Sequence, residues 1–198
     1  MSKLLLTKVG SLGLDSGNVV SKSPDSVAGL ELWLKADAIT PVPDGTALAT
    51  WPDSSGNSRD VIQVSGTQQP LYKTNILNGL PVVRFDGVND TMTNILYTPN
   101  ASAHTILIAY NNYSGNGSFY STNDGNGPLQ RSTAIWYQGS APTIAVTSLG
   151  TRKLLTLLFN YGTDNYSVRQ NGVAGASGSS AVSLVGTTFN LGLSLIHI

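Results

Sequence analysis

The sequence predicts an all-β protein in which two antiparallel sheets pack face to face as a sandwich. Residues 30–36 alternate leucine or alanine with Glu31, Trp33 and Lys35, and this period of two is typical of a strand with one buried face. Further short apolar runs follow at close intervals, bounded by Gly, Asn, Asp and Pro. No stretch of ten or more residues shows a helical stripe with caps, which argues against parallel α/β folds.

The first 28 residues are predicted to be a flexible N-terminal arm or linker. Serine and glycine recur through them, and no periodic element is evident. Leu4-Leu5-Leu6 and Val19-Val20 are the two apolar pieces that could instead pair or dock. The sandwich domain itself is expected over residues 29–192.

The expected strands after residue 29 share β-branched, aromatic or leucine-rich character between turn signals. They are residues 30–36, 60–64, 81–85, 105–111, 134–137, 143–147, 153–160, 166–170 and 173–176. Asn171-Gly172 is the strongest hairpin signal, because both residues accept a positive φ. Residues 154–158 could be helical by composition, but their position between two turn clusters favours a strand.

Alternation within these strands predicts which side chains form the core. The expected core residues are Leu30, Leu32, Leu34, Trp51, Val82, Phe85, Ile106, Ile108, Leu155, Leu157, Tyr166 and Val168.

Composition excludes several classes of function. The 198 residues carry a formal net charge of +0 and only 11% charged side chains, so the chain has no positive electrostatic field that would attract nucleic acid. The chain has 0 cysteines, which excludes disulfides, Cys-ligated zinc and a thiol nucleophile. The apolar stretch near Met1 is too short for a signal peptide, and no run approaches the ~20 residues that span a bilayer.

Four segments in the first half resemble a known family. They are GLELWLKAD at 29–37, WPDSSGN at 51–57, QPLY at 69–72 and NGLPVVRFDGVND at 78–90. In this order they resemble the laminin-G-like jelly-roll domains of the concanavalin A-like lectin/glucanase superfamily. The second half agrees more loosely, through its late strand meander. The resemblance spans roughly residues 29–192 and implies a two-sheet antiparallel jelly roll.

Acidic residues in these segments have two interpretations. The resemblance implies one calcium near the rim of the sandwich, and Asp53, Asp60, Asp86 and Asp90 are oxygen ligands of the kind that calcium prefers. Their spacing does not match a helix–loop–helix calcium loop. The alternative is structural: Asp53 can bond the backbone of its own turn, and Asp86 can close a strand into a turn.

The sequence argues against an enzyme. Lectin-fold glucanases use two glutamates on one strand, whereas Glu31 is the only glutamate here. His104 and His197 are the only histidines, and no Gly-x-Ser-x-Gly elbow is present. We therefore expect no catalytic residues.

A segment rich in Asn, Gly and Tyr, residues 110–127, is the sequence's candidate for carbohydrate binding. Aromatic rings stack on sugar faces, while amides and carboxylates pair with hydroxyls. The candidate residues are Tyr113, Phe119, Tyr120, Asn123 and Asp124. The alternative is an ordinary exposed hairpin.

The function expected from the sequence is a non-catalytic binding module. Its partner would be a glycan or cell-surface polysaccharide, or an adhesive contact, with no nucleic acid and no membrane insertion. The domain would be made in the cytoplasm and carried on a virion or extracellular surface, such as a phage tail or capsid appendage. The alternative is a purely structural spacer or decoration domain without a ligand.

The last six residues, LSLIHI at 193–198, resemble the translation of a transposon end used to prepare sequencing libraries. We therefore expect them not to belong to the natural protein, whose own C-terminus would then be truncated in a metagenomic read. The alternative is that they form a genuine apolar strand that completes the sandwich.

Overall fold

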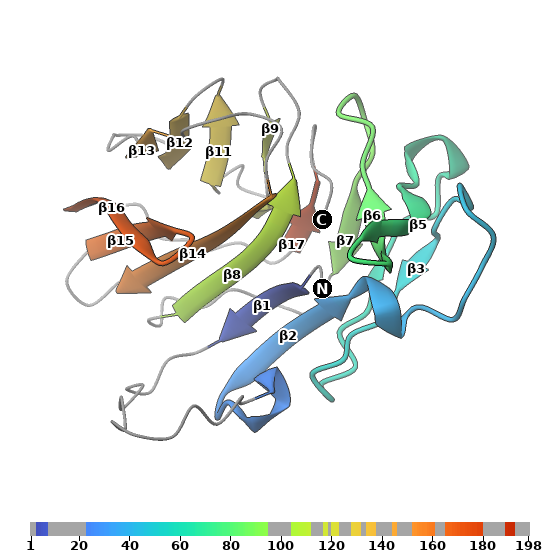
Figure 1. Ribbon diagram of the computed structural model, residues 1–198, viewed down its shortest axis with the longest axis horizontal. Helices are drawn as coiled ribbons and strands as arrows, with labels where there is room; N and C mark the ends of the chain where they lie inside the picture. Colours follow the sequence, from blue (N-terminus) through green and yellow to red (C-terminus); the bar gives the residue numbers. More distant parts are fainter. Residues whose placement is uncertain are drawn as a thin grey trace.

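The computed structural model is built of antiparallel β-strands (Figure 1). It describes residues 3–7, 23–94, 104–111, 117–118, 120–122, 128–131, 134–137, 144–145, 152–160, 165–179 and 189–192. Within these residues the helical elements are three short 3-10 turns: η1 (Pro24–Ser26), η2 (Ala36–Ala38) and η3 (Gly66–Gln68). The predicted all-β sandwich is confirmed.

One layer of the sandwich is a six-stranded antiparallel sheet with the order β16-β15-β14-β8-β1-β2. Its strands are β1 (Lys3–Thr7), β2 (Leu30–Lys35), β8 (His104–Asn111), β14 (Arg152–Asn160), β15 (Asn165–Gln170) and β16 (Val173–Ser179). The hairpin predicted at Asn171-Gly172 joins β15 to β16, with φ of 51° and 80° at the two residues. Residues 154–158 lie within β14, so the strand interpretation is confirmed.

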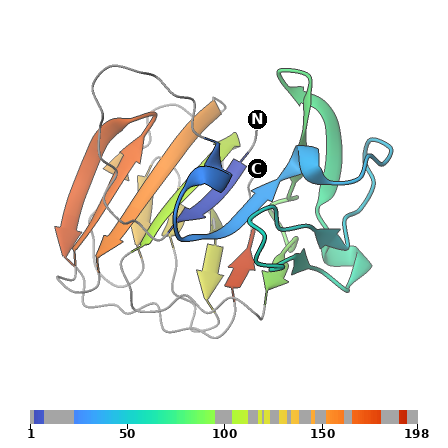
Figure 2. The ribbon, with the colours of Figure 1, turned by 90° about the horizontal axis from the view of Figure 1, so that it is seen from below.

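The opposite layer contains a five-stranded sheet with the order β10-β17-β7-β4-β3 (Figure 2). Its strands are β3 (Thr50–Trp51), β4 (Val61–Ile62), β7 (Met92–Asn94), β10 (Tyr120–Thr122) and β17 (Phe189–Leu191). A four-stranded sheet continues beside β10, with β9 (Gly117–Ser118), β11 (Pro128–Arg131), β12 (Ala134–Tyr137) and β13 (Ile144–Ala145). The strands β5 (Leu71–Leu77) and β6 (Leu80–Arg84) form a separate hairpin.

The core lies between the six-stranded and five-stranded sheets, because alternate residues of each strand point inward. Ten of the twelve core residues expected from the sequence are buried: Leu32, Leu34, Trp51, Val82, Phe85, Ile106, Ile108, Leu155, Leu157 and Val168. Leu30 is only half-buried, because it opens β2 at the margin of the sheet. The side chain of Tyr166 lies outside the described residues.

At residues 3–7 the structure differs from the flexible arm that the sequence predicts and follows the alternative, in which Leu4-Leu5-Leu6 pairs. They form β1, a central strand that pairs with both β2 and β8. Leu4 pairs with Leu34 on one side and with Ile108 on the other. A continuous leucine run has no alternation to mark it as a strand, but a strand with neighbours on both edges satisfies its backbone groups completely.

Near the other end of the chain, β17 pairs with β7 on one side and with β10 on the other. Residues 193–198, and the expectation about their origin, lie outside the described residues. Among the residues that the structure describes, no helix has the length and apolar character needed to cross a membrane.

Candidate functional site

The first acidic turn, residues 51–60, is hydrogen-bonded to β2 and so connects the five-stranded sheet to that strand. Oδ1 of Asp53 accepts hydrogen bonds from the backbone N–H groups of Trp33 at 2.9 Å and Ser55 at 2.8 Å. Oδ2 accepts from the Ser55 hydroxyl at 2.6 Å and the Arg59 N–H at 3.1 Å. Nδ2 of Asn57 donates to the carbonyl oxygen of Leu30 at 2.8 Å. Asp53 therefore bonds the backbone of its own turn, as the structural interpretation predicts, whereas Asn57 bonds β2.

The second acidic turn, residues 85–90, is closed by two carboxylates. Oδ1 of Asp86 accepts from the N–H groups of Val88, Asn89 and Asp90 at 2.8, 3.1 and 3.2 Å. Oδ2 of Asp90 accepts from the Asp86 N–H at 2.8 Å. Gly87, with φ of 81°, takes the left-handed conformation that this tight turn requires.

The four acids proposed for calcium therefore belong to two separate turns. Oδ1 of Asp60 accepts a hydrogen bond from the Asp53 N–H at 2.9 Å, so this pair also stabilises its own loop. No group of three or more acidic or histidine side chains that could hold a metal gathers among the described residues. Calcium takes six to eight oxygen ligands, and N–H donors already occupy one or both oxygens of each of these carboxylates. These contacts do not gather the four acids into one calcium site, and calcium binding by some of them stays a prediction.

The pKa values of the two carboxyl groups in the second turn are shifted in opposite directions. Burial acts to raise the pKa of Asp86, but the three N–H donors outweigh it, and the pKa lies below its ordinary value of 3.8. Burial raises the pKa of Asp90 above 3.8, and the neighbouring Asp86 charge raises it further, against the hydrogen bond from the Asp86 N–H.

We expect Asp86→Asn to lower the free energy of unfolding at pH 7 by about 1 kcal/mol, because a neutral acceptor binds the three N–H groups less well. Asp90→Asn should raise it, since the buried charge disappears while one oxygen still accepts the Asp86 N–H. Because the pKa of Asp86 is lowered on folding, its charge stabilises the folded protein above pH 3.8, and this effect is lost as the pH falls further. Because the pKa of Asp90 is raised on folding, its charge destabilises the folded protein only above pH 3.8. In urea titrations the Asp90→Asn difference should therefore disappear as the pH falls to 3.8, whereas the Asp86→Asn difference should shrink only below pH 3.8. Effects of the same sign at pH 7 would contradict this assignment.

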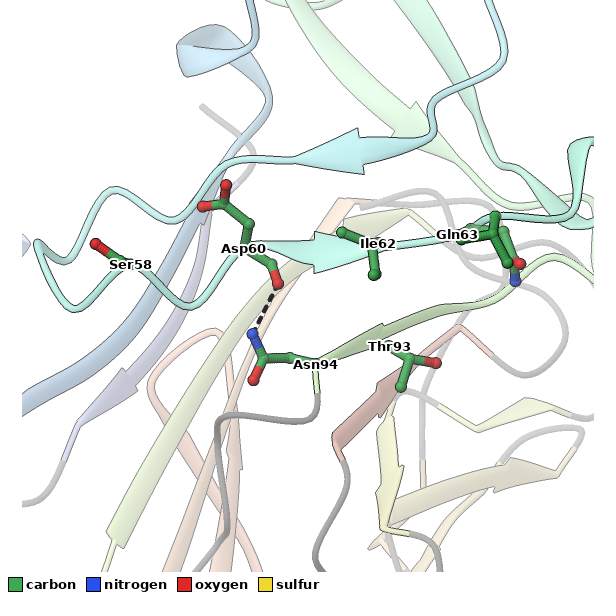
Figure 3. Close-up of a pocket in the computed structure, with 7 residues that line it drawn as sticks. Ser58, Asp60, Ile62, Gln63, Thr93 and Asn94 are labelled. Carbon is green, nitrogen blue, oxygen red and sulfur yellow. Dashed lines mark hydrogen bonds between the residues drawn. The ribbon is translucent and has the colours of Figure 1, made fainter.

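A hollow of about 460 Å³ lies over β4 and β7 and is the candidate ligand site. We call it the β4–β7 hollow; its described lining consists of Ser58, Asp60, Ile62, Gln63, Val64, Thr93 and Asn94. Figure 3 shows residues of β4 and its flanking segments along one side and Thr93 and Asn94 of β7 along the other. Ile62 is 45% exposed and Val64 is 90% exposed, so the lining offers apolar surface to solvent.

Hydrogen bonds hold the polar part of this lining in place. Nδ2 of the buried Asn94 donates to the carbonyl oxygen of Asp60 at 2.7 Å, which ties β7 to the start of β4 (Figure 3). Nε2 of Gln63 donates to the Thr91 carbonyl at 2.8 Å. The hollow therefore combines a hydrogen-bonded floor with an apolar rim, as small-ligand sites commonly do.

The sugar-binding residues predicted from the sequence are only partly within the described chain. Tyr113, Phe119, Asn123 and Asp124 lie outside the described residues. Tyr120 begins β10, where it pairs with the buried Leu191, and nothing is described of its own side chain. The strand that carries Tyr120 nevertheless belongs to the same sheet as the β4–β7 hollow.

Two of the residues weighed for catalysis, His104 and Glu31, lie within the described chain, and His197 lies outside it. His104 is the first residue of β8 and is buried. Glu31 forms an ion pair with Arg59, next to the Asp53 turn. Two glutamates along one strand are excluded by the sequence itself.

No family model and no curated protein matches this chain. The β4–β7 hollow must therefore be interpreted from its own chemistry. Sequence reasoning missed it, although the predicted strand at 60–64 contains the signal: Ile62 and Val64 alternate with the buried Val61 and Gln63, so two aliphatic side chains face outward.

Proposed function

We propose that this protein is a non-catalytic binding module that recognises neutral glycans through the β4–β7 hollow. The observation that carries the proposal is the lining, which combines exposed aliphatic side chains with amide, hydroxyl and carboxylate groups. A sugar ring presents C–H groups and hydroxyls side by side, so it needs both kinds of partner within one site.

The charge of the lining supports a neutral ligand. Among the described lining residues, Asp60 is the only charged one, and no lysine or arginine accompanies it. An acidic or sulfated polysaccharide would meet a carboxylate without a compensating cation. The volume lies within the range of about 300–1,000 Å³ that small-molecule sites occupy, which suits one or two sugar units.

The setting that we propose is a larger virion or cell-surface assembly, such as a phage tail or capsid appendage. The low charge content of the chain and its resemblance to laminin-G-like jelly-roll domains support this setting. In that setting the domain would hold a cell-surface polysaccharide and would not cleave it.

The test is a glycan array followed by titration calorimetry with Ile62→Lys. This substitution replaces the apolar rim of the hollow by a charge, so we expect affinity for the bound neutral glycan to fall by about tenfold or more. Ile76→Lys is the matched control, because Ile76 is similarly exposed at 37% but lies on β5, away from the hollow. The control should bind as the unchanged protein does.

Equal affinity in both variants would overturn the assignment of the site to this hollow. Failure of every glycan to bind, together with a stable self-assembled oligomer, would overturn the binding function and favour the structural spacer. Melting curves of both variants establish that each is folded.

A further inference from the structure

The five-stranded sheet carries a row of residues that continues from the β4–β7 hollow toward the segment that the sequence singled out for sugar binding. The register pairs Ile62 with Thr93, Thr93 with Asn190, and Asn190 with Ser121. We call this the outer row. Cross-strand partners in an antiparallel sheet share one face, so the outer row crosses from β4 to β10 on a single face.

The neighbouring positions show that this face is not the core face. Val61, Met92 and Leu191, each adjacent in sequence to a member of the outer row, are all 0% exposed. Ile62 is 45% exposed, and Thr93 and Asn190 are half-buried. The period of two in the strands thus separates an inner apolar row from an outer row that is mostly polar and carries no charge.

Among the residues that the structure describes, the amide donor of Asn190 has no acceptor. The Thr93 hydroxyl donates to Oδ1 of Asn190 at 3.0 Å, which fixes the orientation of that amide. Nδ2 of Asn190 then points its hydrogens elsewhere and makes no hydrogen bond to the described residues. An oriented amide donor beside an aliphatic surface suits the hydroxyls of a sugar.

We infer that the ligand is a linear, neutral oligosaccharide that starts in the β4–β7 hollow and lies across the strands along the outer row. This inference rests on the proposed function. Three strand spacings of about 4.8 Å separate β4 from β10, a span of about 14 Å that accommodates about three sugar units. In β10 it is Ser121, not Tyr120, that belongs to this row.

The experiment measures affinity against chain length, by calorimetry with cello-, laminari- and chito-oligosaccharides of one to five units. For the series that binds, we expect the dissociation constant to fall by about tenfold or more from one unit to three and then to level off. Asn190→Asp keeps the oxygen that accepts from Thr93 but removes the amide donor. Asn190→Asp should abolish the gain in affinity from one sugar unit to three and leave the affinity for a single unit unchanged.

Thr93→Val is the second variant, since it keeps the shape of the side chain and removes the hydroxyl that orients Asn190. It should also reduce the gain with chain length. Equal affinity for one and three units, or an unchanged gain in affinity in both variants, would overturn the proposal that the ligand lies along the outer row. Either result would leave the glycan-binding function intact. No binding of any neutral sugar at any length would overturn the proposed function itself.

Discussion

Trp51→Ala is expected to lower the free energy of unfolding by about 4 kcal/mol, because it empties a large volume in the core. Trp51 is 0% exposed and lies on β3, where its ring packs in the core between the two sheets. Its Nε1–H also donates to the Lys35 carbonyl oxygen at 2.9 Å, so the truncation leaves a polar group without its partner as well as a cavity.

Trp51→Phe separates these two contributions. It keeps an aromatic ring in the core and removes the N–H donor, and we expect a loss of about 2 kcal/mol, roughly half that of alanine. Urea denaturation monitored by circular dichroism measures both. If the two variants lost the same stability, the hydrogen bond to Lys35 and not the packing of the ring would dominate.

Gly192→Ala is expected to lower the free energy of unfolding by about 3 kcal/mol or more, from two causes that add. Gly192 follows β17 with φ of +79°, a conformation that alanine adopts only with strain. A Cβ at this position would also lie 2.2 Å from Cδ1 of Phe85, far inside van der Waals contact. Phe85 is itself 2% exposed in the core, where close packing restricts the movement of a ring.

Gly172→Ala is the matched control for this prediction, and urea denaturation measures both variants. Gly172 has nearly the same φ, +80°, but a Cβ there would meet nothing within 4 Å. It should cost only the backbone strain, about 1 kcal/mol. Equal losses in the two variants would show that the Phe85 ring moves aside, and would contradict a close-packed contact between Gly192 and that ring.

The β4–β7 hollow and the outer row depend on contacts that a sequence pattern does not contain. The sequence predicts a strand over residues 60–64, and its alternation indicates that Ile62 faces outward. The register that sets Ile62 beside Thr93, and Thr93 beside Asn190, joins segments up to about a hundred residues apart. The sequence leaves two interpretations of the carboxylates open, as metal ligands or as acceptors that close turns, and their bonds to nearby N–H groups support the second.

The fold class, most of the core and the hairpin at Asn171-Gly172 are predictable from the sequence alone. These features depend on periodicity and on local backbone preference, which a residue carries with it. The neighbours of each strand are known only from the folded protein, in which Lys3–Thr7 is a central strand and Phe189–Leu191 lies between β7 and β10. A period of two tells which side of a strand is buried, but it does not tell which strand lies beside it. That choice is made by the backbone hydrogen bonds and shared apolar surface of segments that meet only when the chain has folded.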